Sequence, residues 1–126
     1  MTGQPASPSK KTVVVVDDEP GFCETVKDLL EDEGYAVEIA MDGRAGLDLL
    51  RRLAARPCLL VLDLIMPELD GAAVYRELLA DPRLATIPVV FATSDPTRAP
   101  DGAPVMAKPL TVDRLLQVVR GSCGPS

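Results

Sequence analysis

Short apolar runs alternate along the chain with longer segments in which apolar residues recur at helical spacing. The runs fall at residues 10–16, 35–40, 58–63, 88–92 and 105–107. Each is short enough to be a strand, and several are almost wholly apolar, which is typical of strands covered on both faces. The pattern therefore predicts an α/β fold of βαβ units, with a parallel sheet between two helical layers.

The segments at residues 20–33, 44–56, 71–80 and 112–120 are expected to be helices. In the first, Phe22, Val26, Leu29 and Leu30 lie on one helical face, and Gly34 is expected to end the helix. The second is expected to end at Pro57.

The boundaries of these segments carry turn and capping residues. Asp70 and Thr111 are expected N-caps of the third and last helices, and Asp42 with Gly43 is expected to form a turn. Residues 1–9 are expected to be a disordered tail, residues 10–120 a single domain, and residues 121–126 a frayed tail.

Composition narrows the classes of function. The chain has 126 residues and a net charge of −6, which argues against binding nucleic acid or an anionic membrane. It has no transmembrane-length apolar run and no signal peptide. Because it has no histidine, Ser-His-Asp hydrolysis, His-zinc sites and a phosphohistidine-carrier role are excluded. Three cysteines without a C-x-x-C pair are interpreted as reduced thiols in a cytoplasmic protein.

Polar residues follow four of the predicted strands. They are Asp17 and Asp18 after the first, Asp63 at the third, Thr93 after the fourth and Lys108 after the fifth. Because the carboxyl ends of parallel strands share one edge, these side chains are expected to converge there. Three carboxylates and one lysine favour Mg²⁺, and such a set is equipped to accept a phosphoryl group on Asp63.

Each of these residues also has a simpler interpretation. Asp17 and Asp18 can merely begin a helix, and Thr93 can be a cap or turn residue. Lys108 can lie in a solvated loop, and Asp63 can be an unusual core residue. The coincidence at four strand ends favours a site.

Four motifs in order resemble the receiver domain of two-component response regulators (CheY-like). They are Val-Val-Asp-Asp-Glu-Pro (15–20), Asp-Leu-Ile-Met-Pro-Glu-Leu-Asp-Gly (63–71), Ile-Pro-Val-Val-Phe-Ala-Thr-Ser (87–94) and Ala-Lys-Pro-Leu (107–110). The resemblance covers about residues 10–120. It implies a flavodoxin-like, doubly wound sheet of five parallel strands in the order 2-1-3-4-5.

The resemblance also implies roles for single residues. Asp63 would take a phosphoryl group from a partner histidine kinase or phosphotransfer protein. Asp18, Asp63 and the backbone carbonyl of Ile65 would bind Mg²⁺ directly, and Asp17 would act through water. Thr93, Lys108 and the backbone N–H of Ser94 would hold the phosphoryl group. The downstream protein target is unknown.

The sequence departs from the family in two places. Val105 occupies the position, three before the lysine, at which the family usually has an aromatic switch residue. Only the 11 residues 94–104 join the fourth and fifth strands, and they include Pro96, Pro100 and Pro104. Since a crossover normally needs at least about 10–12 residues including its helix, the fourth helix is expected to be shortened or absent.

Three hypotheses follow. The first is a phosphoacceptor signalling domain that is not an enzyme. The second is a receiver-like interaction module that does not switch on phosphorylation. The third is an aspartyl-phosphate phosphatase, which is disfavoured because the first strand is not followed by D-x-D-x-T.

Overall fold

The computed structural model describes residues 11–126, so the expected tail at 1–9 lies outside the described residues. Within that range five strands form one parallel sheet. They are β1 (Thr12–Val16), β2 (Ala36–Ala40), β3 (Leu59–Leu62), β4 (Val89–Thr93) and β5 (Val105–Ala107). Their order is β2-β1-β3-β4-β5, which confirms the predicted topology.

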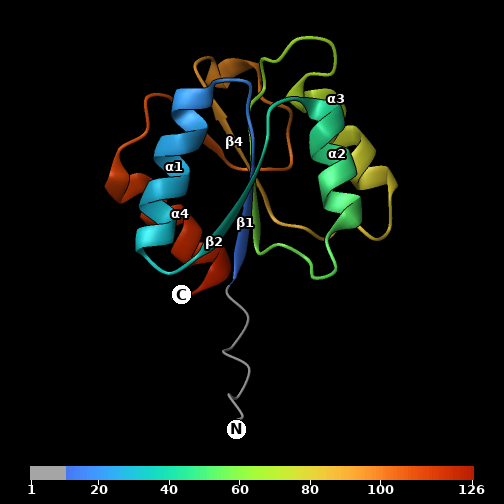
Figure 1. Ribbon diagram of the computed structural model, residues 1–126. Coiled ribbons are helices and arrows are strands. Elements are labelled where there is room, and N and C mark those ends of the chain that lie inside the picture. The colour runs from blue at the N-terminus through green and yellow to red at the C-terminus, as the bar shows by residue number, and fades with distance from the viewer. Residues whose placement is uncertain (1–10) are drawn as a thin grey trace, which may run out of the picture.

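Helices cover both faces of the sheet, as Figure 1 shows. They are α1 (Pro20–Asp32), α2 (Gly43–Arg52), α3 (Gly71–Ala80) and α4 (Val112–Cys123). Helices α1 and α4 lie on one face, and α2 and α3 lie on the other. The predicted doubly wound architecture is confirmed.

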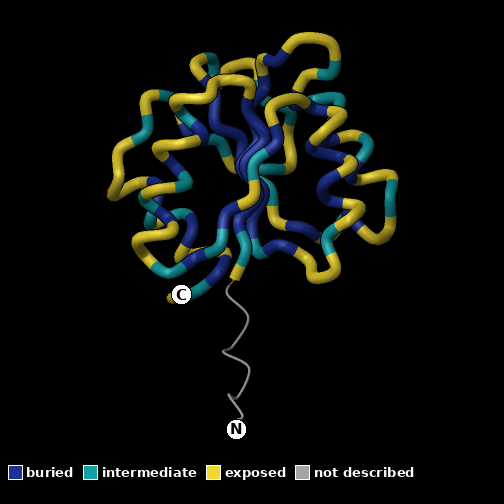
Figure 2. Tube along the Cα trace, viewed as in Figure 1, coloured by how far each residue is buried: buried dark blue, intermediate teal, exposed yellow. Residues whose placement is uncertain are grey.

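The central strands are buried on both faces, as the dark core of Figure 2 shows. In β1, Val13 and Val15 pack toward α1 and α4, whereas Val14 and Val16 pack toward α2 and α3. This alternation follows from the two-residue period of a strand. It explains why β1 is an unbroken run of valines rather than an apolar–polar alternation.

The connection between β4 and β5 contains only one 3₁₀ turn, η1 (Pro96–Arg98). Within 94–104 there is no α-helix, which confirms the expectation from the short, proline-rich segment. The helix labelled α4 is therefore the last helix of the chain, and the sheet near β5 lacks the cover that a fourth crossover helix would supply.

Helix ends agree with the capping signals, with some corrections. Asp70 and Thr111 accept bonds from the backbone N–H groups of Ala73 and Arg114, as N-caps do. Gly34, which follows the C-cap Glu33 of α1, has φ +95°, in the left-handed region that a glycine adopts readily. Asp42, expected only in a turn, is the N-cap of α2.

One helix boundary was wrong. Helix α2 ends at Arg52, not at Arg56, because Leu53 has an extended backbone. In α1 the predicted core face is confirmed, because Val26 and Leu30 are buried and Phe22 and Leu29 pack partly buried against the same core. The Phe22 ring also makes a second contact that is described below.

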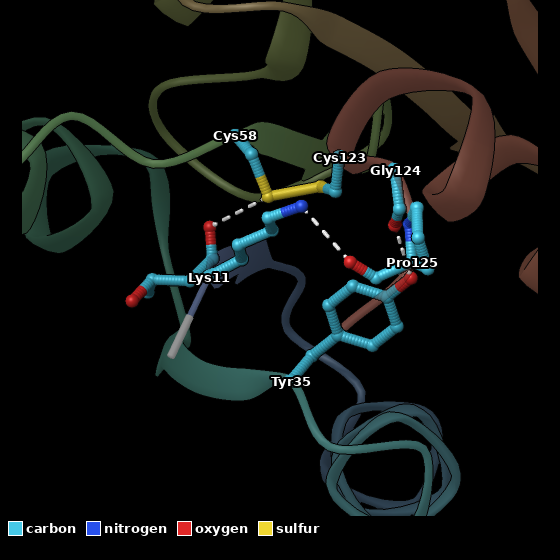
Figure 3. The surroundings of a disulfide bond; sticks show 7 residues. Lys11, Tyr35, Cys58, Cys123, Gly124 and Pro125 are labelled. Carbon is cyan, nitrogen blue, oxygen red and sulfur yellow. Dashed lines mark hydrogen bonds between the residues drawn. A yellow bond between two sulfur atoms is a disulfide. The ribbon is translucent and has the colours of Figure 1, made fainter. Parts of the chain in front are cut away.

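The prediction of a frayed end at 121–126 was wrong. Helix α4 continues to Cys123, and the following residues are bonded to the lower end of the sheet (Figure 3). The Tyr35 hydroxyl donates to the carbonyl of Gly124 at 2.6 Å, and Lys11 Nζ donates to the carbonyl of Pro125 at 2.9 Å. The first described residue and the end of the chain are thus neighbours, at the pole away from the carboxyl ends of the strands.

The cysteines also differ from the expectation of three reduced thiols. Cys58 and Cys123 form a disulfide, and Cys23 is the one unpaired cysteine within residues 11–126. Their spacing of 65 residues gave no signal for the pairing.

Candidate functional site

The polar residues at four strand ends meet at one edge of the sheet. Asp17 and Asp63 directly follow β1 and β3, Thr93 ends β4, and Lys108 directly follows β5. The parallel registers bring these ends level, and the backbone N–H of Asp63 donates to the carbonyl of Val16 at 2.9 Å. The site lies at the upper end of the sheet in Figure 1.

Three carboxylates come together at this edge. Asp17, Asp18 and Asp63 each offer an oxygen, and these atoms lie within 4.8 Å of one another. Asp17 and Asp63 are 1% and 5% exposed, whereas Asp18 is open to solvent. Carboxylates this close repel one another unless a cation compensates them. The cluster has the oxygen donors that a hard divalent cation prefers.

Lys108 supplies the cation that the structure does contain. Its Nζ lies 2.7 Å from Asp17 Oδ2 and 2.8 Å from Glu19 Oε1, but 3.9 Å from Asp63 Oδ2. Its ammonium group also lies 4.2 Å from the centre of the Phe22 ring, which is a cation–π arrangement. Lys108 is therefore held mainly by ion pairs with Asp17 and Glu19, and its interaction with the Asp63 carboxylate is the longest of the three.

Burial and charge shift the pKa values of this cluster. Burial, and then the negative charge of Asp17, raise the pKa of Asp63 to about 6. Burial also raises the pKa of Asp17, although the hydrogen bond from Lys108 opposes the change. For Lys108, burial alone would lower the pKa, but the hydrogen bonds to Asp17 and Glu19 outweigh it and the pKa is raised. Asp63 is thus the carboxylate that one lysine leaves under-compensated.

The neighbouring donors are arranged around Asp63 and Thr93. The backbone N–H of Ile65 points at Asp63 Oδ1 at 3.4 Å. The Thr93 side chain is fully buried, and its Oγ1 accepts from the N–H of Asp95 at 3.1 Å. Ser94, next to Thr93, is exposed at the mouth of the site.

The loop after Asp63 passes close to the start of α3. A Cβ on Gly71 would lie 2.1 Å from the carbonyl oxygen of Asp63, so only glycine fits there. The N–H of Gly71 donates to the carbonyl of Leu64 at 2.9 Å. This close approach fixes the loop that carries Ile65. The Asp-Gly at 70–71 thus combines a helix cap with a packing requirement.

The sequence reasoning assigned no role to two residues of the site. Glu19 shares Lys108 with Asp17, and Phe22 lies under the ammonium group. Glu19 is part of the Asp-Asp-Glu-Pro motif. The motif predicted that Glu19 lies near the site, but not that it pairs with Lys108. The spacing of Phe22 predicted its place on the core face of α1 but gave no signal for its contact with Lys108. Val105 pairs with Phe91 in the sheet register and packs half-buried against the α2–α3 side.

A groove of about 540 Å³ adjoins the site between α1 and the start of α4. Its walls include Phe22, Leu110, Val112 and Leu115, and Lys108 lies at its edge. Among residues 11–126, no helix has the length and hydropathy needed to span a membrane. The cytoplasmic location expected from the sequence stays a prediction.

Comparisons with known proteins agree with this geometry. The family model for the response regulator receiver domain matches residues 13–120. The regulator DivK of Brucella anthropi, named for polar differentiation, is 31% identical over 121 residues, which cover 90% of this chain and 97% of DivK. The DNA-binding transcriptional regulator RpaA of Synechocystis sp. is 35% identical over 115 residues, covering 86% of this chain.

The chain spans only 47% of the length of RpaA. It likewise spans 36% of the response regulator Rre1 of Synechocystis sp. and 28% of the response regulator MprA of Mycolicibacterium vanbaalenii. Among solved structures, the receiver domain of a signal transduction histidine kinase from Syntrophus aciditrophicus is 36% identical, with a TM-score of 0.71. It covers 87% of this chain, which matches 92% of that domain. On the family match and the relatives, this chain belongs to the response regulator receiver domains.

Proposed function

We propose that the protein is a phosphoacceptor domain that receives a phosphoryl group on Asp63 from a phosphohistidine of a histidine kinase or phosphotransfer protein, with Mg²⁺ as cofactor. The observation that carries the proposal is the convergence of three carboxylates within 4.8 Å at the strand ends, with Lys108 at their edge. The family match supports the same conclusion.

Asp63 is suited to be the nucleophile. With a pKa of about 6, about nine in ten Asp63 side chains are ionised at pH 7. In the step, a carboxylate oxygen forms a bond to phosphorus, and the bond from phosphorus to the donor's imidazole nitrogen breaks with its electron pair leaving on nitrogen. The product is an acyl phosphate.

The neighbouring groups can hold the transferred group. Lys108 Nζ lies 3.9 Å from Asp63 Oδ2 and can pair with a phosphoryl oxygen that extends from it. Thr93 Oγ1 already accepts from Asp95, so its hydroxyl hydrogen is free to donate to a phosphoryl oxygen. The backbone N–H groups of Ile65 and Ser94 are further donors for such an oxygen.

The carboxylates fit Mg²⁺ in unequal roles. Asp17 Oδ1 accepts from the N–H of Glu19 at 2.9 Å, and its Oδ2 accepts from Lys108 at 2.7 Å. Both Asp17 oxygens are thus engaged at short distance, which favours a contact through water. Asp63 has only longer contacts, from the Ile65 N–H at 3.4 Å and Lys108 Nζ at 3.9 Å, and Asp18 is open to solvent, which favours direct ligation by these two along with the Ile65 carbonyl. When bound, Mg²⁺ would neutralise charge on the phosphoryl oxygens.

The partner is proposed from the same edge of the molecule. The apolar groove beside Lys108 offers a docking surface for the donor protein next to Asp63. The net charge of −6 does not favour nucleic acid as a direct ligand.

Incubation with acetyl phosphate and Mg²⁺, followed by intact-mass measurement, tests the proposal. We expect one phosphoryl adduct on the wild-type protein and none on Asp63→Asn. Asp48→Asn is the matched control, because Asp48 is exposed on α2 away from the site. An adduct on Asp63→Asn, or none on the wild type, would contradict the proposal.

A second candidate is a receiver-like interaction module that does not switch. It is favoured by the single 3₁₀ turn at Pro96–Arg98 and by Val105, which has no ring to reorient. NMR spectra with and without beryllofluoride and Mg²⁺ separate the two. Shifts confined to the site support the non-switching module, and shifts that extend to β5 and α4 support a switching one.

We also propose that the chain is not an aspartyl-phosphate phosphatase. The first strand is followed by Asp17-Asp18-Glu19-Pro20, without the threonine of the D-x-D-x-T motif. Sustained turnover of p-nitrophenyl phosphate by the wild type would overturn this.

A further inference from the structure

The disulfide lies at the pole of the molecule opposite the carboxylates (Figure 3). Cys58 directly precedes β3, and Cys123 is the last residue of α4. Their Cα atoms are 5.1 Å apart although 65 residues separate them in the chain. We propose that Cys58 and Cys123 form a reversible thiol–disulfide exchange site that fastens the end of α4 when oxidised and loosens it when reduced. This proposal is independent of the function proposed for Asp63.

The surroundings accommodate both redox states of the pair. Cys58 Sγ lies 3.4 Å from the carbonyl oxygen of Thr12, the contact drawn as a dashed line in Figure 3. In the reduced state the thiol has this oxygen as a hydrogen-bond acceptor. The same carbonyl also accepts from the backbone N–H of Cys58 at 2.9 Å, which keeps the residue in place in either state. Opening the disulfide therefore leaves no orphaned polar group at Cys58.

The two sulfur atoms differ in access and in electrostatic setting. Cys58 is partly exposed, whereas Cys123 is 7% exposed. Figure 3 shows the Lys11 side chain passing beside the disulfide, with its ammonium group bonded to the carbonyl of Pro125. The C-terminal end of a helix disfavours a negative charge at Cys123, and Cys123 is also the less exposed of the two. Cys58 is thus the residue that exchanges first.

The reaction partner is a small-molecule disulfide such as oxidised glutathione. The Cys58 thiolate attacks one sulfur of that disulfide, forms a mixed disulfide and releases one small thiolate. The Cys123 thiolate then attacks the Cys58 sulfur and releases the second small thiolate. The two protons lost by the cysteines are taken up by the two released thiolates. The protein dithiol is oxidised by two electrons, and the small disulfide is reduced to two thiols.

Non-covalent contacts hold the same end of the chain. The Tyr35 hydroxyl bonds to Gly124, Lys11 bonds to Pro125, and the Ser126 hydroxyl bonds to the carbonyl of Glu33. Reduction of the disulfide therefore leaves the end of α4 docked by hydrogen bonds. The expected change is a local loosening rather than unfolding.

Cys23 provides an internal contrast. It is 1% exposed on the buried face of α1, and burial raises the pKa of its thiol to about 11. A thiol with these properties is a poor nucleophile at neutral pH. It should take no part in exchange, so Cys23→Ser is the matched control.

To test the proposal, the protein is equilibrated in a series of glutathione buffers in which the ratio of reduced to oxidised glutathione decreases. After acid quenching and denaturation, N-ethylmaleimide labels the free thiols, and intact mass counts the adducts. We expect three adducts in the most reducing buffers and one in the most oxidising, with the midpoint inside the series. Tryptic digestion places the three cysteines on three different peptides, and the Cys58 and Cys123 peptides should be joined.

Cysteine variants test whether the internal disulfide between Cys58 and Cys123 accounts for the loss of adducts. Cys23→Ser should lose its two remaining adducts at the same midpoint as the wild type, whereas Cys58→Ser and Cys123→Ser should form no internal bond. The proposal would be overturned if the wild type carried three adducts in every buffer of the series, or one adduct in every buffer. It would also be overturned if cross-linked dimers formed in place of the internal disulfide. If a variant does not fold, the peptide map of the wild type still decides.

Hydrogen exchange of backbone amides measures how far reduction loosens the end of α4. The N–H of Gly124 donates to the carbonyl of Arg120 at 2.8 Å and lies next to Cys123. Reduction should speed its exchange about tenfold, while the amide of Asp63 at the other pole should not change. Equal rates at Gly124 in both redox states would show that the bond does not lock the helix end.

Discussion

The carboxyl group of Asp63 destabilises the metal-free fold when it is ionised, and Asp63→Asn should remove this effect. The pKa of Asp63 is about 6 in the folded protein against an ordinary value of 3.8, with burial as the main cause. At about 1.4 kcal/mol for each tenfold change in acidity, this difference corresponds to about 3 kcal/mol. The substitution should raise the free energy of unfolding by about this amount at pH 7 to 8.

The effect has a defined pH dependence. Because the folded-state pKa is raised, the destabilisation is complete above pH 6 and disappears as the pH falls below 3.8, where both states are protonated. The advantage of Asp63→Asn should therefore shrink to about 0.5 kcal/mol near pH 4. Above pH 6 it should correspond to about 10 °C in Tm for a domain of this size.

Urea unfolding followed by circular dichroism, from about pH 4 to about pH 8 with EDTA present, measures this directly. Asp48→Asn removes the same charge from an exposed position on α2 and should change stability by less than about 0.5 kcal/mol. A gain at Asp63→Asn that is equal at pH 4 and pH 8, or a loss at pH 8, would refute the reasoning.

Three further predictions concern the same site. Lys108→Met leaves the buried carboxylate of Asp17 unpaired, so it should lower the free energy of unfolding by about 3 kcal/mol at pH 7, and by less at acidic pH where Asp17 is protonated; urea titrations at both pH values check this. Gly71→Ala places a Cβ 2.1 Å from the Asp63 carbonyl and should cost about 2 kcal/mol, measured by thermal unfolding, together with slower phosphorylation by acetyl phosphate. Mg²⁺ should raise the Tm of the wild type in a concentration-dependent way, and Asp18→Asn should weaken the apparent affinity about tenfold; an unchanged affinity would remove Asp18 from the ligand set.

The local pattern was sufficient to predict the sheet and the place of the site. Runs such as Val13–Val16 are typical of strands covered on both faces, and Asp63 at the end of such a run marks the edge where ligands bind. The missing helix between β4 and β5 was also predictable, because the length and proline content of 94–104 are local properties.

The features that were missed depend on contacts between residues far apart in the chain. Glycine and proline at 121–126 favour a frayed end, but Tyr35 and Lys11 bind that segment from about ninety or more positions away. The pairing of Cys58 with Cys123 likewise has no local signal. The helical spacing of Phe22 predicted its packing against the core but not that its ring also lies under Lys108. In each case the contacting residue is brought close only by the folding of the chain, so the local sequence does not indicate it.

The position of Lys11 beside Pro125 has a practical consequence for biosensor construction. A fluorescent label joined next to either residue would begin at the pole away from Asp63, about 16 Å away along a five-residue strand. Such a label would stay clear of an approaching donor protein. Two labels, one at each of these residues, would lie close together whatever the state of Asp63. An energy-transfer reporter of phosphorylation would therefore need one label elsewhere, for example in the exposed turn at Pro96–Arg98.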